Sequence, residues 1–187
     1  MGSPMKTAIR MLFLLLAGTF AASAAESDTG AENVAVVRQY HDALNRSDWK
    51  SATQYFAVDS RNFGNPAGRP VISRILEDIY RTFPDFRLII VDAVSQGDVV
   101  VVRAKEKGTH RGVGRVPVNG GMLVGVAPTN KQFEVDTIHW YKLRDGKIID
   151  HYATRNDLSM MQQLGLSPKP EPFDWAKFAA DANKPQP

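Results

Sequence analysis

The 187-residue chain contains no cysteine. This absence excludes disulfide bonds, thiolate zinc sites, iron–sulfur clusters and a cysteine nucleophile. It also excludes the lipid anchor that bacterial lipoproteins attach to a cysteine. An excess of either charge is lacking as well, because 23 Lys and Arg stand against 20 Asp and Glu. Any chemistry therefore depends on carboxylates, imidazoles, hydroxyls and amides.

No long hydrophobic run is present either. Lys6 and Arg10 precede an apolar stretch at 11–20, about half the roughly 20 residues that span a bilayer, so a stable membrane anchor is not expected. Small residues follow and end in Ala22-Ser23-Ala24, which is typical of a secretory signal peptide. We expect cleavage near Ala24 and export to the periplasm or medium. Without Lys6 and Arg10 the net charge falls from +3 to +1, which disfavours nucleic acid as a partner.

The mature sequence predicts an α+β fold of a single domain at 25–166, followed by a Pro-rich tail at 167–187. Hydrophobic periodicity indicates helices first and strands afterwards, an order typical of helices packed on one face of an antiparallel sheet. A strongly curved sheet of this kind leaves a pocket beneath it. The predicted helices are 32–44, 49–56, 70–83 and 157–164, and the predicted strands are 87–95, 99–109, 132–143 and 147–155.

Several familiar catalytic motifs are missing. The glycine-rich stretch at 111–131 lacks the spacing of a dinucleotide cradle, and no Gly-Lys-Ser/Thr phosphate loop is present. The four histidines have no zinc-like spacing, and no Gly-x-Ser-x-Gly elbow occurs. We therefore expect neither a metal nor a cofactor.

Six short motifs stand in a characteristic order along the chain. They are Phe83-Pro84-Asp85, Gly108-Thr109-His110-Arg111-Gly112, Pro128-Thr129-Asn130-Lys131, Asp145-Gly146-Lys147-Ile148, His151-Tyr152 and Gln163-Leu164-Gly165. Together they resemble the SnoaL-like polyketide or ester cyclases of the nuclear transport factor 2-like superfamily. The resemblance implies a cone-shaped, curved sheet with about three helices around a deep apolar pocket. It also implies a homodimer and a cofactor-free aldol ring closure, with an aspartate near the end of the last strand as acid/base group.

Two positions depart from the pattern of that family. Asn156 stands where the resemblance places the aspartate, and an amide cannot take up a proton as a general base. The neighbouring Asp157 is better explained as a cap of the helix that follows it. Phe63 replaces a loop histidine that is common in the family.

The Asp145-Gly146 turn leaves two strand registers open. A two-residue turn places Tyr152, Thr154 and Asn156 on the face of His139. A three-residue loop with a glycine bulge instead places Asp136 on the face of Tyr152 and Thr154. Only the second register gives the pocket a carboxylate, and the alternative is an ion pair of Asp136 with Arg155 on the other face.

Two functions from different classes follow. The first is a cofactor-free enzyme acting on a small hydrophobic carbonyl or ester compound, with Asp136 and His139 as acid/base groups and Asn156 orienting a carbonyl. The second is a non-catalytic protein that binds a small hydrophobic molecule in the same pocket. The predicted substrate-binding residues, shared by both, are Tyr40, Tyr80, His110, Trp140, Tyr152 and Thr154.

Overall fold

A computed structural model describes residues 29–116 and 121–168 of the chain. The predicted signal peptide at 1–24 and the tail from residue 169 onward lie outside these residues. Among the described residues, no helix combines the length and the apolar character needed to cross a membrane.

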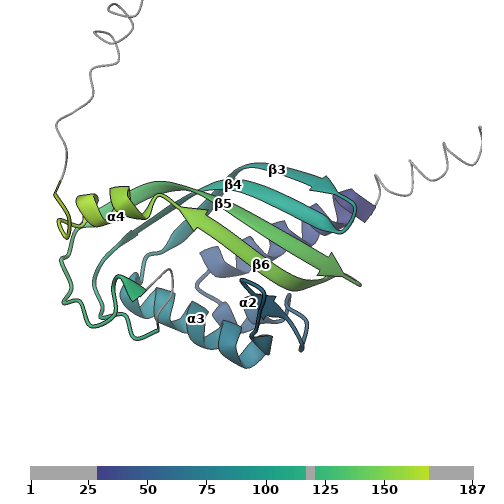
Figure 1. Cartoon of the computed structure of the whole chain (residues 1–187), viewed down its shortest axis with the longest axis horizontal. Coiled ribbons are helices and arrows are strands. Elements are labelled where there is room, and N and C mark those ends of the chain that lie inside the picture. Colours follow the sequence, from purple (N-terminus) through teal and green to yellow (C-terminus); the bar gives the residue numbers. More distant parts are fainter. Residues whose placement is uncertain (1–28, 117–120, 169–187) are drawn as a thin grey trace, which may run out of the picture.

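The first three helices of the described residues form one layer of the molecule (Figure 1). The first covers residues 29–45. It is followed by α2, Trp49–Thr53, which begins at an Asp48 cap, and by α3, Gly68–Thr82. Ile72, Leu76 and Tyr80 are buried along α3 at a spacing of four residues, as an amphipathic helix on a sheet requires.

Four strands form the second layer, in the antiparallel order β3-β4-β5-β6. Their bounds are β3 Arg87–Gln96, β4 Val99–Thr109, β5 Gln132–Arg144 and β6 Lys147–Arg155. The helices cover one face of the curved sheet, and the short α4, Asp157–Gln163, lies at one end (Figure 1). Buried and exposed residues alternate along β5, so one face of the sheet faces the helices and the other faces solvent. The predicted α+β architecture is confirmed.

A small hairpin occupies part of the segment that the sequence predicted as a loop. Strands β1, Arg61–Asn62, and β2, Asn65–Pro66, pair with each other. The N–H of Phe63 donates to the carbonyl oxygen of His151 at 2.9 Å, so the hairpin lies against the free edge of β6.

The β5–β6 register differs from both alternatives considered for the sequence. Asp145 and Gly146 form a two-residue turn with φ of 50° and 66°, and Arg144 pairs with Lys147. A bulge then shifts the pairing, so that Tyr141 faces His151. Ile148 is buried and His151 also points inward, and two inward residues three positions apart require such an irregularity in a strand of period two.

Candidate active site

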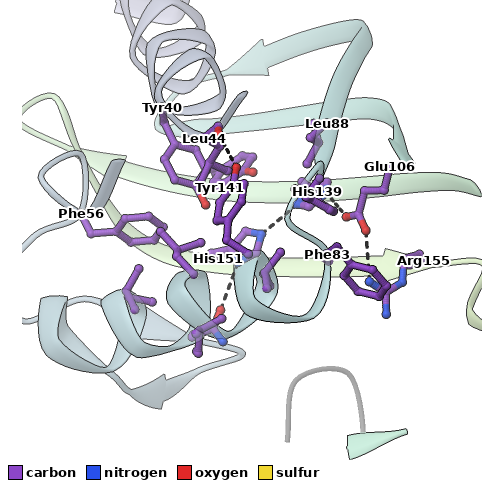
Figure 2. Close-up of a pocket in the computed structure, with 18 of the residues that line it drawn as sticks. Tyr40, Leu44, Phe56, Phe83, Leu88, Glu106, His139, Tyr141, His151 and Arg155 are labelled. Carbon is purple, nitrogen blue, oxygen red and sulfur yellow. Dashed lines mark hydrogen bonds and ion pairs between the residues drawn. The ribbon is translucent and has the colours of Figure 1, made fainter. Parts of the chain in front are cut away.

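A pocket of about 100 Å³ lies between the sheet and the helices (Figure 2). The engineered cavity that holds a benzene molecule is larger, at about 150 Å³, so the part of a ligand inside this pocket has at most about the bulk of a single small ring. Most of its walls are apolar, including Leu44 and Phe56 from the helical layer and Leu88 from β3. Most polar residues of the wall lie on the four-stranded sheet, namely Glu106, His139, Tyr141, His151 and Arg155. Tyr40 and Tyr80 come from helices and Asn62 from β1.

Glu106 is a buried carboxylate on β4, with 6% of its surface exposed. Val100, Val102 and Ala104 precede it on the same face of the strand and are completely buried. The opposite face carries Arg103, so the alternation of the strand forces Glu106 into the interior. An uncompensated buried charge is strongly unfavourable, and partners for this carboxylate are therefore expected.

His139, on the neighbouring strand β5, is the first partner. Its Nε2 atom lies 3.2 Å from Glu106 Oε1 and 3.1 Å from Thr137 Oγ1. Thr137 donates its own hydroxyl hydrogen to the carbonyl oxygen of Thr154 at 3.0 Å, so its oxygen accepts from His139. Nε2 of His139 therefore carries a hydrogen.

His151 on β6 extends the network, with its Nε2 atom 3.0 Å from His139 Nδ1. Its Nδ1 atom lies 3.0 Å from the amide oxygen of Asn62, which can only accept. His151 thus donates from Nδ1, and Glu106, His139, His151 and Asn62 form one continuous chain of hydrogen bonds. Burial, followed by the charge of His139, holds the pKa of His151 well below its usual range.

Arg155 is the second partner of Glu106, and its Nη1 donates to Oε2 at 3.1 Å (Figure 2). Its Nε donates to Asp157 at 2.6 Å. Burial tends to raise the pKa of Glu106, but the hydrogen bond from His139 and the charge of Arg155 outweigh burial and hold the pKa below its usual value. Glu106 is therefore ionised in the folded protein at neutral pH.

Tyr141 adds a hydroxyl beside this network. Its oxygen lies 2.7 Å from Nε2 of His41, which is 1% exposed. Burial raises the pKa of Tyr141 well above its usual value and lowers that of His41 well below its own. Both side chains are therefore neutral over the physiological pH range, and Tyr141 keeps its hydroxyl hydrogen.

The structure moves four predicted residues out of the pocket. The side chain of Asp136 is 71% exposed and pairs with Lys105 at 3.3 Å, so its predicted role as a buried acid is wrong. Trp140, Tyr152 and Thr154 share that outer face, because the bulge pairs Trp140 with Tyr152 while both side chains point away from the helices. Their predicted contact with a ligand inside the pocket is therefore wrong for Trp140 and Tyr152, whereas Thr154 lines a second hollow at the edge of β6 and its role in binding stays a prediction.

Asn156 and His110 have structural positions instead. The side chain of Asn156 accepts from the N–H of Ser159 at 3.1 Å and caps α4, so it does not orient a carbonyl in the pocket. His110 is completely buried beside Phe83 and does not line the pocket, and its main chain pairs with the loop that precedes β5. His139, Tyr40 and Tyr80 do line the pocket, and their roles in binding or catalysis stay predictions.

Sequence reasoning missed Glu106, although a signal was present. Positions 103, 105 and 107 of β4 are all basic, which assigns the even positions, Glu106 among them, to the buried face. His151 and Arg155 were missed for another reason, because their inward orientation depends on the bulge. No group of three or more residues able to hold a metal ion is present in the part of the chain that the structure describes.

Comparisons with known proteins agree with this architecture. The family model of SnoaL-like polyketide cyclases matches residues 34–164. The chain belongs to this family. No curated protein is similar enough to count as a match.

Solved structures of other proteins show a similar fold. AclR from Streptomyces galilaeus superposes with a TM-score of 0.60 at 22% identity, covering 74% of this chain and 98% of its own. TsrD from Streptomyces laurentii gives 0.61 at 23% identity, with 73% and 97% covered. IdmH from Streptomyces antibioticus gives 0.58 at 24% identity, with 71% and 98% covered. At such identities the likeness establishes the nuclear transport factor 2-like fold and nothing finer.

Proposed function

We propose that this member of the SnoaL-like family is an exported enzyme that removes a proton next to the carbonyl group of a small, uncharged ketone or ester, without a cofactor. The observation that carries the proposal is the buried pair of Glu106 and His139 facing an apolar pocket. The predicted signal peptide supports export.

Glu106 is the proposed base. A carboxylate offers about four lone-pair positions, and its hydrogen bonds to His139 and Arg155 occupy one on each oxygen. In the first step a proton passes from the α carbon to a Glu106 oxygen, and the C–H electron pair moves toward the carbonyl oxygen. The ring nitrogens of His139 already bond to Glu106, Thr137 and His151, so the hydroxyl of Tyr141 is the proposed donor to the developing negative charge. Preorganised donors of this kind lower the barrier most effectively in a dry site.

Two observations favour a second function, a non-catalytic binding protein. The lowered pKa of Glu106 makes it a weak base, and the polar groups of the pocket already satisfy one another. A ligand that only fills the apolar volume would leave this network intact. The two functions differ in whether a bound compound is changed.

Hydrogen–deuterium exchange of cyclopentanone in D₂O tests the proposal. Loss of the α-proton signal is followed by NMR with the wild type, with Glu106→Gln, which preserves shape but cannot accept the proton, and with His139→Asn. Removal of a general base is expected to slow catalysed exchange about 10²- to 10⁴-fold. Asp136→Asn is the matched control, because this exposed carboxylate lies outside the pocket, and its exchange rate should equal that of the wild type.

Three results would count against the enzyme. Wild-type protein that binds cyclopentanone without accelerating exchange supports the binding function instead. Glu106→Gln with wild-type exchange shows that the base is misassigned. Wild-type protein that shows no chemical-shift change with cyclopentanone removes the pocket as a site for this class of ligand.

A further inference from the structure

Phe63 sits in a backbone conformation that its residue type disfavours. It forms a two-residue turn with Gly64 between β1 and β2, and the φ angles are 53° and 72°. Turns with two positive φ angles strongly favour Asn-Gly, because a side chain at the first position crowds the backbone. An aromatic residue with 42% of its surface exposed gains little from burial that would offset this strain. A local folding role therefore does not explain Phe63.

The turn is fixed on the edge of β6, which sets the position of the Phe63 ring. Asn62 accepts from His151, and the N–H of Phe63 donates to the carbonyl oxygen of His151. Gly64 has a φ of 72°, which favours glycine, and a Cβ atom there would also lie 2.8 Å from the hydroxyl oxygen of Tyr152. The Phe63 ring centroid lies 6.2 Å from that of His151 and 5.4 Å from that of Tyr152.

At this position Phe63 borders two cavities. The first is the inner pocket described above. The second, of about 290 Å³, opens beside the edge of β6, and we call it the vestibule. Phe63, Glu106, Ala153 and Arg155 line both cavities. The proposed base therefore borders both cavities.

We infer that Phe63 is a specificity-determining residue that divides one elongated binding site into two parts. The inner pocket takes a head of one small ring, and the vestibule takes an uncharged tail, with the carbonyl group at Glu106 between them. An ester of a small cyclic acid has this form, with its alkoxy chain in the vestibule. The vestibule is lined by two carboxylates, Glu106 and Asp157, and by one guanidinium, that of Arg155. This excess of negative charge disfavours an anionic tail. The inference rests on the proposed function, because it places the ligand by the proposed base.

Binding of two sets of neutral β-keto esters tests the inference by calorimetry. The first set holds a one-ring head and varies the tail: methyl, butyl and octyl 2-oxocyclopentanecarboxylate. For the wild type, each CH₂ buried in the vestibule should tighten binding up to about fourfold, and the gain should stop once the vestibule is full. The second set holds the methyl ester and enlarges the head to two rings, with methyl 1-oxoindane-2-carboxylate. The wild type should bind this compound at least about tenfold more weakly than its one-ring counterpart, because the ring of Phe63 closes the junction.

Three variants of Phe63 separate its side chain from its backbone. Phe63→Ala and Phe63→Asn should both reduce the preference for one ring at least about tenfold, and Phe63→Asn should also raise the melting temperature, because asparagine suits the turn. Phe63→Leu keeps an apolar side chain of similar reach and should retain the wild-type preference.

An unchanged ring preference in folded Phe63→Asn overturns the inference. If exchange of cyclopentanone still depends on Glu106, the proposed function stands without it. If the wild type binds none of the one-ring esters and exchanges no cyclopentanone, both fail. If the affinity of the octyl ester rises by the full factor of about fourfold for every added CH₂, the vestibule does not have the limited size proposed here.

Discussion

Acid should destabilise this protein well above the pH range in which carboxylates titrate. His41 and His151 are both held neutral in the folded state, because burial, aided by the charge of His139, lowers the pKa of each well below its usual value. In the unfolded chain the same side chains take up protons near about pH 6.5. His151 keeps some surface exposure, but its ring lies among Tyr141, His139 and Phe63.

The direction in which the free energy of unfolding changes with pH follows from proton linkage. Below about pH 6.5 the unfolded chain binds more protons than the folded protein, so lowering the pH favours unfolding. Each histidine that stays neutral in the folded state removes about 1 kcal/mol of unfolding free energy between about pH 6.5 and 5.5, and the two together remove about 2 kcal/mol. His110 adds less, because a hydrogen bond with the main chain of Gly112 partly opposes the effect of burial on its pKa. Glu106, whose pKa is lowered from 4.5, does not contribute in this window.

Urea unfolding at about pH 7.5, 6.5 and 5.5 measures the effect. His41→Gln removes one of the two groups while its amide can still meet the Tyr141 hydroxyl, so the loss between the two lower pH values should fall to about 1 kcal/mol. Asp136→Asn should keep the full loss, since this side chain is exposed. A free energy of unfolding that stays constant over the three pH values, or an equal loss in His41→Gln, would refute the reasoning.

Three shorter predictions concern the frame around the site. Asn156→Ala should lose about 1 kcal/mol of unfolding free energy by removing the cap of α4, whereas Asn156→Asp should retain stability and leave exchange of cyclopentanone unchanged. Asp78→Asn should lose about 1–3 kcal/mol in urea unfolding, because the buried carboxylate accepts two main-chain N–H groups of the glycine-rich loop; a wild-type midpoint would contradict this. The homodimer expected from the family resemblance stays a prediction: Ile138, 41% exposed on the outer sheet face, should give a monomer when changed to lysine, and a monomeric wild type in sedimentation would remove the idea.

Most of the fold was predictable because its signals are local. The Asp145-Gly146 turn and the alternation of β4 and β5 depend on neighbouring residues only. The bulge in β6 was not predictable in this way. The N–H of Ile148 donates to the carbonyl oxygen of Tyr55, and its own carbonyl oxygen accepts from Ala57. The start of β6 is thus held by the segment after α2, far away in sequence, and the strand must shift to bring its later residues into the pocket.

The shifted pairing of β6 determines which of its residues line the pocket. The simple two-residue register places Tyr152 and Thr154 on the face of His139. The bulge instead places them on the outer face with Asp136, as the three-residue register also grouped them, and it brings His151, Ala153 and Arg155 inside. The charged pair predicted for Asp136 and Arg155 therefore cannot form, and Arg155 pairs with Glu106 and Asp157.

The resulting charge arrangement explains how the pocket can lack an acid at the end of its last strand. In this chain β6 contributes a guanidinium to the interior at Arg155, and the carboxylate comes from β4 through Glu106. His139 lies on β5 between these two strands and contacts the carboxylate directly. Because neighbouring strands of one sheet hold these three groups, their geometry is more rigid than that of groups held on loops. Asn156 has no acid/base role in this arrangement, and its side chain caps the start of α4. A search for the activity of this protein should therefore focus on Glu106 and not on the position that the family pattern indicates.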